Sequence, residues 1–268
     1  MSVSQRSVRL CCALMVAAGL IAVGPDRVAL AEDASAATAF GWGAPDAALS
    51  DEFDGGSAPS PAFWESYASA GHDGNGLRRP SQNTVDDGHL QIAGLADGTS
   101  GGMMSHRVYP AFGRWEVRMR VDEQGVGSAY HPVVALIPAG VPYAGGAGDL
   151  DFAESDAGSG RAYVFVHYPP NKQDYASVPV DLADWHTYAI EVAPDHVSWF
   201  VDGAVAMTDT NPAAITGVDW TTNIQLDAYH PSGLAPSNLQ VDYLRFYPLP
   251  SSGVPTVPGP APSAGAYR

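Results

Sequence analysis

Hydrophobic and polar residues alternate along much of this chain. In the segment 113–122 charged residues separate the apolar positions, which are Trp115, Val117, Met119 and Val121. The segment 239–247 begins with the same alternation, at Leu239, Val241 and Tyr243. Successive side chains of a strand point to opposite faces, so a period of two predicts strands with one buried face.

Further strands are predicted at 162–168, 186–193 and 197–202, where β-forming residues are bounded by Pro, Gly or Asp. Asp202-Gly203 is typical of a hairpin turn, because glycine tolerates a positive φ. The chain contains 29 Gly and 22 Pro, and no segment shows helical spacing beyond a turn or so. Many short strands separated by turns predict an all-β fold, a sandwich of two antiparallel sheets.

The start of the chain has the composition of a targeting segment. Arg6 and Arg9 precede the apolar stretch Leu10–Val23, and small residues follow at 29–31. This order predicts a signal peptide over residues 1–31. The apolar stretch is shorter than the roughly 20 residues of a spanning helix, so no membrane span is expected. We therefore predict a secreted, extracellular protein.

The remaining chain is divided into three parts. Residues 32–44 are Ala-rich and are expected to be flexible, whereas 45–248 carry the pattern of one domain. Residues 249–268 are Pro-rich and uncharged before Arg268, which predicts an extended tail compatible with cell-wall association. We expect a monomer.

Charge and cysteine content exclude several classes of function. The chain has 13 Lys+Arg against 29 Asp+Glu, a net charge of -16, whereas a nucleic-acid-binding protein needs clustered basic residues. The two cysteines, Cys11 and Cys12, lie in the predicted signal peptide, so the mature chain has no thiolate for metal binding or catalysis. Its histidines have no His-x-x-x-His or His-x-His spacing, which disfavours zinc catalysis.

Three carboxylates interrupt an apolar run at 148–157. Asp149 and Asp151 are two residues apart and share one face of a strand. Glu154 is three residues further on, so it returns to that face only if one extra residue forms a bulge at Phe152-Ala153. We predict a row of three acids on one sheet face, with Leu150 and Phe152 packed behind it.

Such a row suits the hydrolysis of glycosides. The reaction needs an ionised carboxylate near the anomeric carbon and a protonated carboxyl group that donates to the leaving oxygen. A third acid between them separates their pKa values, because crowded like charges cannot all ionise. A calcium site and an exposed acidic strand remain alternatives, since Ca²⁺ also prefers carboxylate oxygens.

Beyond this row, the chain resembles glycoside hydrolase family 16, the laminarinase and lichenase group. That family carries Glu-x-Asp-x-x-Glu as nucleophile, assisting acid and acid/base. The resemblance implies a concanavalin A-like β-jelly roll with a substrate cleft on its concave face, and a retaining endo-β-glycanase. The segments that carry it are 51–54 with Trp64, 85–90, 109–120, 185–188, 199–203 and 241–247.

By this resemblance, Glu154 is the acid/base, Asp151 the assisting carboxylate, and His167 a cleft histidine near the acid. Asp149 stands where the family has its nucleophilic Glu. Aspartate is one methylene shorter, and a displacement of about 1 Å can cost on the order of 10²-fold in rate. Three outcomes stay open: a shifted backbone lets Asp149 attack, a water enters and the reaction inverts, or the site binds sugar without cutting it.

The chain departs from the family pattern where the substrate is gripped. Where the family often has Trp-Pro-Ala-Phe-Trp, this chain has His131-Pro132-Val133-Val134-Ala135, which removes two indole platforms. The expected substrate contacts are His131, Tyr130, Trp220, His167 and Arg79, with Tyr168, Tyr229 and His230 as further aromatic candidates. The chemistry requires no cofactor. By the resemblance, Glu52, Gly88 and Asp242 match the positions of a structural Ca²⁺ in several family members; the alternative is that Asp242 is simply a solvent-facing strand residue.

The predicted function is a secreted glycosidase that cleaves internal β-linkages of a polysaccharide, β-glucan-like in kind. The alternative is a non-catalytic carbohydrate-binding protein on the same scaffold. A calcium-dependent adhesion or cell-wall protein is the third hypothesis.

Overall fold

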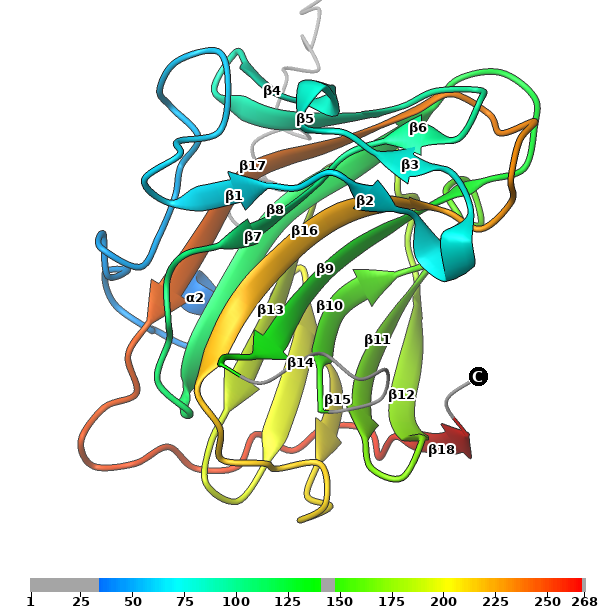
Figure 1. Ribbon diagram of the computed structural model, residues 1–268. Helices are drawn as coiled ribbons and strands as arrows, with labels where there is room; N and C mark the ends of the chain where they lie inside the picture. Colours follow the sequence, from blue (N-terminus) through cyan, green and yellow to red (C-terminus); the bar gives the residue numbers. More distant parts are fainter. Residues whose placement is uncertain (1–33, 141–147, 267–268) are drawn as a thin grey trace, which may run out of the picture.

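A computed structural model describes residues 34–140 and 148–266. Its architecture is two large antiparallel sheets packed face to face (Figure 1), which confirms the predicted all-β sandwich. The predicted signal peptide, 1–31, lies outside the described residues. In the part of the chain that is described, no helix is long and apolar enough to cross a membrane.

The eight-stranded sheet carries the candidate site. Its strands, in spatial order, are β1 (Trp64–Ser66), β7 (Gly102–Ser105), β16 (Trp220–Ala228), β9 (Tyr130–Pro138), β10 (Leu150–Glu154), β11 (Arg161–Tyr168), β12 (Lys172–Pro179) and β18 (Ser263–Ala266).

The seven-stranded sheet lies behind it in Figure 1. Its strands, in order, are β15 (Ala204–Asp209), β14 (Val197–Val201), β13 (His186–Val192), β8 (Gly113–Glu123), β17 (Ser237–Tyr247), β5 (His89–Gly94) and β4 (Asn83–Asp86). A small third sheet comprises β2 (Ser69–Ala70), β3 (Leu77–Arg78) and β6 (Thr99–Ser100). Within the described residues the helical elements are α2 (Ala36–Ala39), η1 (His72–Gly74) and η2 (Pro80–Gln82).

The core lies between the two large sheets and follows from the alternating pattern. Trp115, Val117, Met119 and Val121 are all buried in β8, as the period of two predicted. Apolar side chains from the eight-stranded sheet meet them, among them Ile224 and Leu226 of β16. The opposite side chains of β16 and its neighbours face outward, which leaves one broad surface for polar chemistry.

The predicted bulge is present in β10. Asp151 pairs with Phe165 of β11, whereas Glu154 pairs with Tyr163, so three residues of β10 span two of β11. The register against β9 shifts at the same point. Phe152 and Ala153 are both buried, and Glu154 returns to the face of Asp151. Trp199 of the opposite sheet donates its indole N–H to the Asp151 carbonyl at 2.9 Å.

Both terminal segments pack more closely than the sequence led us to expect. Trp42 lies edge-on to Phe200 and Tyr247 on the outer face of the seven-stranded sheet, and Ala36 is buried beside it. The described part of 32–44 is therefore packed on the domain, because one indole and a small-residue turn suffice to cover this apolar surface.

The Pro-rich segment also returns to the domain instead of extending away. Its strand β18 pairs with β12, and the carbonyl of Pro260 accepts from the Thr208 amide at 3.1 Å. These contacts use backbone groups, which an apolar pattern does not reveal.

The Trp199 contact predicts a stability effect. Trp199→Phe leaves the buried Asp151 carbonyl without this donor and should lower the free energy of unfolding by about 1–3 kcal/mol, measured by urea denaturation. Trp185→Phe, at a partly exposed indole near Arg118 and Arg120, should cost less. Equal losses in the two variants would contradict a special role for the Trp199 bond.

Candidate active site

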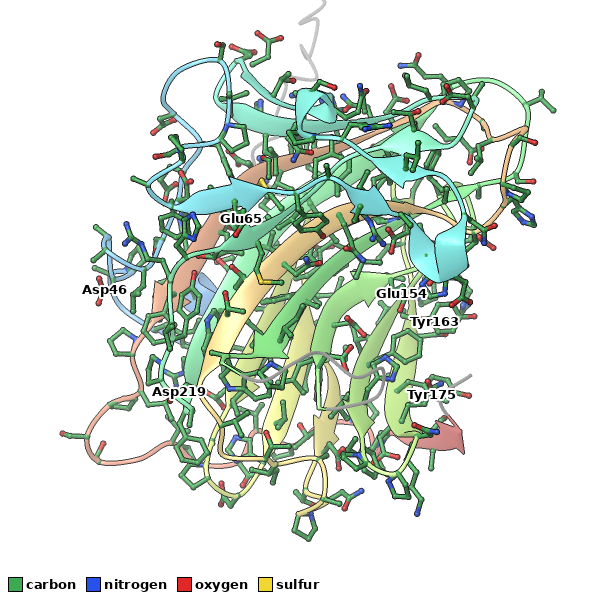
Figure 2. All side chains as sticks on the ribbon, in the orientation of Figure 1. Asp46, Glu65, Glu154, Tyr163, Tyr175 and Asp219 are labelled. Atoms are coloured by element: carbon green, nitrogen blue, oxygen red, sulfur yellow. The ribbon has the colours of Figure 1, made fainter. Side chains whose placement is uncertain are left out.

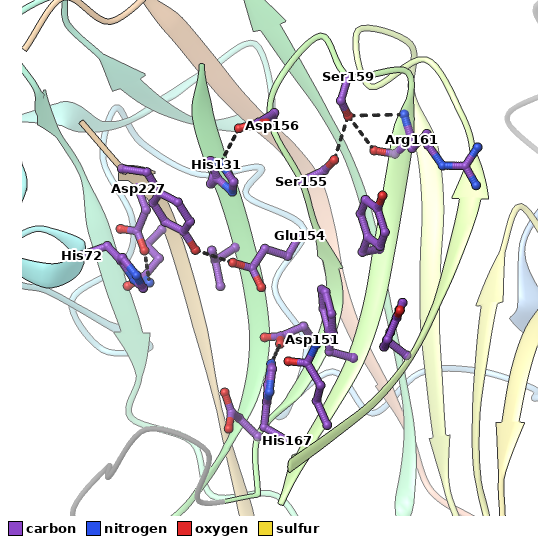
Figure 3. Close-up of a pocket in the computed structure, with 18 of the residues that line it drawn as sticks. His72, His131, Asp151, Glu154, Ser155, Asp156, Ser159, Arg161, His167 and Asp227 are labelled. Atoms are coloured by element: carbon purple, nitrogen blue, oxygen red, sulfur yellow. Dashed lines mark hydrogen bonds and ion pairs between the residues drawn. The ribbon is translucent and has the colours of Figure 1, made fainter. Parts of the chain in front are cut away.

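A cleft of about 630 Å³ opens on the outward face of the eight-stranded sheet (Figure 3). Strands β16, β9, β10, β11 and β12 form its floor, and β18 and the loop at η1 form its ends. Among the residues that line it are His72, His131, Asp149, Asp151, Glu154, Asp156, Arg161, Tyr163, Phe165, His167, Tyr175, Gln225, Asp227, Tyr229 and Gly265.

The three predicted carboxylates share this cleft. Asp149 immediately precedes β10, after Gly148 with a φ of 109°, and Asp151 and Glu154 lie on the strand. All three line the cleft, while Leu150 and Phe152 are fully buried behind them. The row of acids that the spacing predicted is therefore formed, and it depends on the bulge.

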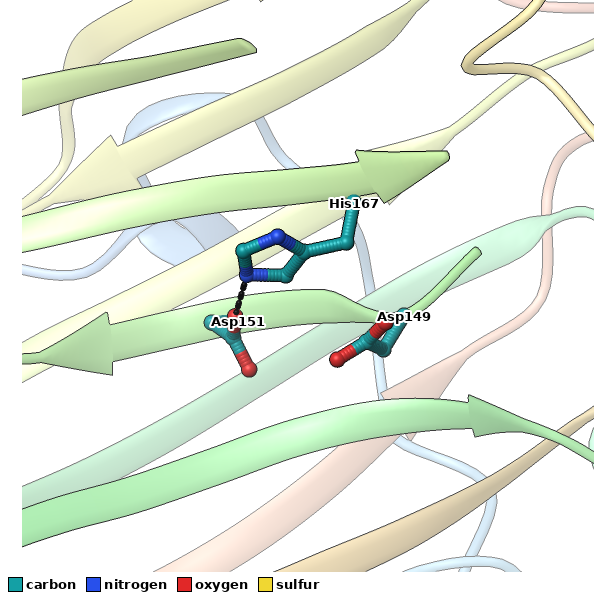
Figure 4. A group of neighbouring side chains, drawn as sticks. All are labelled: Asp149, Asp151 and His167. Carbon is teal, nitrogen blue, oxygen red and sulfur yellow. Dashed lines mark hydrogen bonds and ion pairs between the residues drawn. The ribbon is translucent and has the colours of Figure 1, made fainter. Parts of the chain in front are cut away.

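The central acid of the row, Asp151, is paired with His167. The Nε2 atom of His167 lies 3.0 Å from Oδ2 of Asp151, and both side chains are buried (Figure 4). Burial raises the pKa of Asp151 to about 7. Burial also lowers the pKa of His167, although the charges of Asp149 and Glu154 oppose this shift. Below about pH 7 both shifts favour a protonated, uncharged Asp151 beside a neutral imidazole.

His167 also links the first two acids. Its backbone N–H donates to the Asp149 carbonyl at 2.9 Å. One ligand-type atom from each of Asp149, Asp151 and His167 lies within 4.8 Å of the others, so these groups can hold a divalent cation as well as a proton. This keeps the metal-binding alternative on the same residues as the catalytic one.

Glu154 has the properties of a general acid. Burial, followed by the charge of Asp151, raises its pKa to about 7. The Tyr229 hydroxyl donates to its Oε1 atom at 2.5 Å and opposes that rise. Glu154 is only partly buried, so it stays accessible from the cleft. A carboxyl group that is half protonated near neutral pH suits proton donation.

Aromatic rings lie on one side of the acids. The rings of Tyr163 and Phe165 are 6.0 Å apart and nearly parallel, and Tyr175 of β12 lies 5.7 Å from Phe165. Figure 2 shows Tyr163 next to Glu154, and Tyr175 further down the same side of the molecule. The alternation in 162–168 already predicts that Tyr163, Phe165 and His167 lie together, because these three odd positions share one face of the strand. Of these three residues, only His167 was among the predicted substrate contacts.

Charged and amide groups lie on the other side. Arg78 of β3 donates Nε to Asp227 at 2.8 Å, and Asp227 also accepts from the Gln225 amide at 2.7 Å. Burial raises the pKa of Asp227, and Arg78 opposes the shift. The sequence pointed to Arg79, but Arg79 is exposed and does not line the cleft. Its neighbour Arg78 instead contacts the cleft residue Asp227, and Arg161 of β11 is the arginine that lines the cleft.

Two expected substrate contacts belong to the core. Tyr130 and Trp220 are fully buried; the Tyr130 hydroxyl donates to the Leu95 carbonyl and the Trp220 indole to the Ala111 carbonyl. Alternation explains both positions: Tyr130 points away from its neighbour His131, and Trp220 shares a face with Ile224 and Leu226. Neither lines the cleft, whereas the predicted contacts His131 and His167 do.

The expected calcium ligands carry other partners. Both carboxylate oxygens of Glu52 accept from Arg245, at 2.8 and 2.7 Å. Asp242 accepts from Arg118 at 2.6 Å and lies 3.8 Å from His89. A calcium ion would have to displace both arginines, so as arranged these carboxylates do not fit a calcium site with Gly88. The calcium site stays a sequence prediction.

Comparison with known proteins gives one family. The sequence profile described as glycosyl hydrolases family 16 matches residues 75–229, more than half of the chain. This match spans β10, the cleft floor and Tyr229. No curated protein matches the chain at the level of sequence.

Solved structures give the same fold. The laminarinase from Rhodothermus marinus has 23% identity, a TM-score of 0.63, and coverage of 77% of this chain and 96% of its own. A non-specific endo-β-1,3(4)-glucanase from family 16, with an oligosaccharide at its active site, has 20% identity, a TM-score of 0.64 and coverage of 76% and 96%. A structure described with endo-acting O-glycanases of the human gut microbiota has 20% identity, a TM-score of 0.63 and coverage of 75% and 98%. At these identities the similarity establishes the fold.

The raised pKa of Glu154 predicts a pH-dependent stability. Because its folded value of about 7 exceeds the ordinary 4.5, its stabilising contribution is complete below about pH 4.5 and is lost as pH rises through about 7. Glu154→Gln removes this titration. The variant should therefore gain up to about 3 kcal/mol in unfolding free energy relative to the wild type between pH 4.5 and 8.

Urea denaturation at several pH values measures this difference. Asp219→Asn, at an exposed carboxylate on the opposite side of the molecule in Figure 2, is the matched control and should show no such trend. Parallel pH curves for wild type and Glu154→Gln would contradict the shifted pKa.

Proposed function

The chain belongs to glycosyl hydrolases family 16, and we propose from this premise that it cleaves internal β-glycosidic bonds of a polysaccharide. One observation carries the proposal. A partly accessible glutamic acid with a pKa of about 7 lies in an open cleft, in a row with two further carboxylates. Family membership supports the hydrolysis of glycosides, and this row provides both a proton donor and a carboxylate that can attack the anomeric carbon.

Glu154 is proposed to protonate the glycosidic oxygen. Its environment keeps a large fraction of the carboxyl group protonated below pH 7, which is the form that a general acid needs. The leaving sugar departs with that proton, and Glu154 becomes a carboxylate. In the second half of the reaction the carboxylate accepts a proton from the attacking water. Activity should therefore decline as pH rises through about 7.

Asp149 is proposed to attack the anomeric carbon and to form the glycosyl-enzyme intermediate. It lines the same cleft as Glu154, at the other end of the row, and a double displacement needs two carboxyl groups that flank the glycosidic bond. Asp151, paired with His167, sits between them and limits the negative charge of the row. This assignment takes the first of the three possibilities for the shorter aspartate, with retention of the anomeric configuration.

The cleft supports a polymeric substrate. Its floor crosses five strands, and its aromatic side offers Tyr163, Phe165 and Tyr175 to the apolar faces of sugar rings. Gln225 and Asp227 offer polar atoms on the opposite side. These rings replace the indoles missing at 131–135. The structural relatives include a laminarinase and an endo-β-1,3(4)-glucanase, so β-glucans are the first substrates to examine. We also propose that the protein acts outside the cell.

Removal of the proposed acid tests the function. Glu154→Gln should lower kcat/KM on a responsive β-glucan or galactan by on the order of 10³-fold, because protonation of the leaving oxygen is lost. Reducing-sugar release from a glycan panel measures it, and Asp219→Asn is the control with unchanged activity. Full activity of Glu154→Gln would contradict the role of Glu154, and glycan binding without any product would favour the carbohydrate-binding alternative.

The stereochemistry of the product tests Asp149. If Asp149 is the nucleophile, the sugar released first is the β-anomer, because two displacements restore the configuration. Proton NMR of the anomeric region in the first minutes of hydrolysis measures the ratio before mutarotation. An initial excess of the α-anomer would instead indicate a water-mediated, inverting reaction.

A further inference from the structure

Tyr229 is held between two histidine rings. The ring of His131 stacks on it with centroids 3.7 Å apart and planes 13° apart. The ring of His72 stacks at 4.2 Å and 23°, which makes Tyr229 the middle layer of the three. Figure 3 shows His72 and His131 on the same side of the cleft as Asp227. The stack leaves the Tyr229 ring little freedom to rotate.

The loop at η1 fixes this stack from outside the main sheet. Asn75 donates its side-chain amide to the Tyr229 carbonyl at 3.2 Å, and the backbone N–H of Gly71 donates to Gly76 at 3.2 Å, closing the loop. On the other face, His131 is in contact with Asp156, which restrains the imidazole. Tyr229 is therefore restrained by β9, by the η1 loop and by its own position after β16.

This restraint aims the Tyr229 hydroxyl at a single atom. It donates to Oε1 of Glu154 at 2.5 Å. With Oε1 engaged, the other oxygen of Glu154 is left for the glycosidic bond. The carboxyl group is thereby oriented before substrate arrives, which is the condition for efficient proton transfer.

We propose that Tyr229 is a positioning residue for the acid/base, and that its hydroxyl stabilises the charge which Glu154 acquires as it gives up its proton. The inference rests on the proposed function of Glu154. A hydrogen bond to a carboxylate is stronger than one to a neutral carboxyl group. The bond therefore strengthens as the proton leaves, and it favours the transition state over the ground state.

The same hydrogen bond affects the equilibrium between the protonated and the ionised carboxyl group of Glu154. Donation from Tyr229 lowers the pKa of Glu154, whereas burial and the charge of Asp151 raise it. Loss of the hydroxyl should raise this pKa further. The other titratable or charged groups around Glu154 and Tyr229 stay in place in such a variant; they are Asp149, Asp151, His167, Asp227, Arg78, His131 with Asp156, and His72 with Asp73.

Tyr229→Phe tests the proposal, because it removes one oxygen and keeps the ring in the stack. On a glycan that the wild type cleaves, kcat should fall about 10- to 100-fold while KM stays within about twofold. The alkaline limb of the kcat profile should move to higher pH, since the raised pKa keeps Glu154 protonated longer. Tyr229 lies outside the core, so the melting temperature should stay close to that of the wild type.

Tyr163→Phe is the matched control for the pH readout. Tyr163 lines the same cleft and pairs in register with Glu154, and among the described residues its hydroxyl makes no hydrogen bond to Glu154. Its alkaline limb should stay where the wild type has it. An unchanged kcat and limb in Tyr229→Phe, with Glu154→Gln inactive, would overturn the role of Tyr229 alone. Full activity of Glu154→Gln would instead overturn the proposed function.

Discussion

The extra residue in β10 is the constraint on which the candidate site depends. In a regular strand Glu154 would face the core, and the cleft would hold two carboxylates without the third. The bulge turns it outward while Phe152 and Ala153 both stay buried. Trp199 reaches across from the other sheet and binds the Asp151 carbonyl at this irregular point, so the packing of the sandwich supports the geometry of the acids. Fold and site are coupled through one indole N–H.

Burial raises the pKa values of Asp151 and Glu154, and it lowers the stability of the fold at a pH where these acids are ionised. Removal from water opposes ionisation, which is why both Asp151 and Glu154 hold protons up to near neutral pH. The environment then divides the roles. The imidazole of His167 is hydrogen-bonded to Asp151, whereas the hydroxyl of Tyr229 donates to Glu154. These two neighbouring carboxylates therefore differ in their hydrogen-bond partners, as expected of acids that have different proposed roles.

Local pattern predicted the features that local chain geometry controls. Alternation predicted the strands, the shared face of Asp149 and Asp151, and the bulge that brings Glu154 beside them. The same alternation places Tyr130 on the face opposite His131 and Trp220 on the face of Ile224, so both aromatic residues belong to the core. Contacts between distant segments could not be obtained in this way. His72, His131 and Tyr229 come from three separate segments, and only the folded chain stacks their rings.

The C-terminal strand has a consequence for the sheet as a whole. By pairing with β12, β18 occupies backbone donors and acceptors that would otherwise face solvent along a free strand edge. Free edges invite strand addition from a second molecule. Gly265 of β18 also borders the cleft. A chain that ends before residue 263 would therefore lose the part of the cleft that β18 forms, and the edge of β12 would be exposed. Pairing of this edge with a second molecule would then compete with the binding of a polysaccharide in the same cleft.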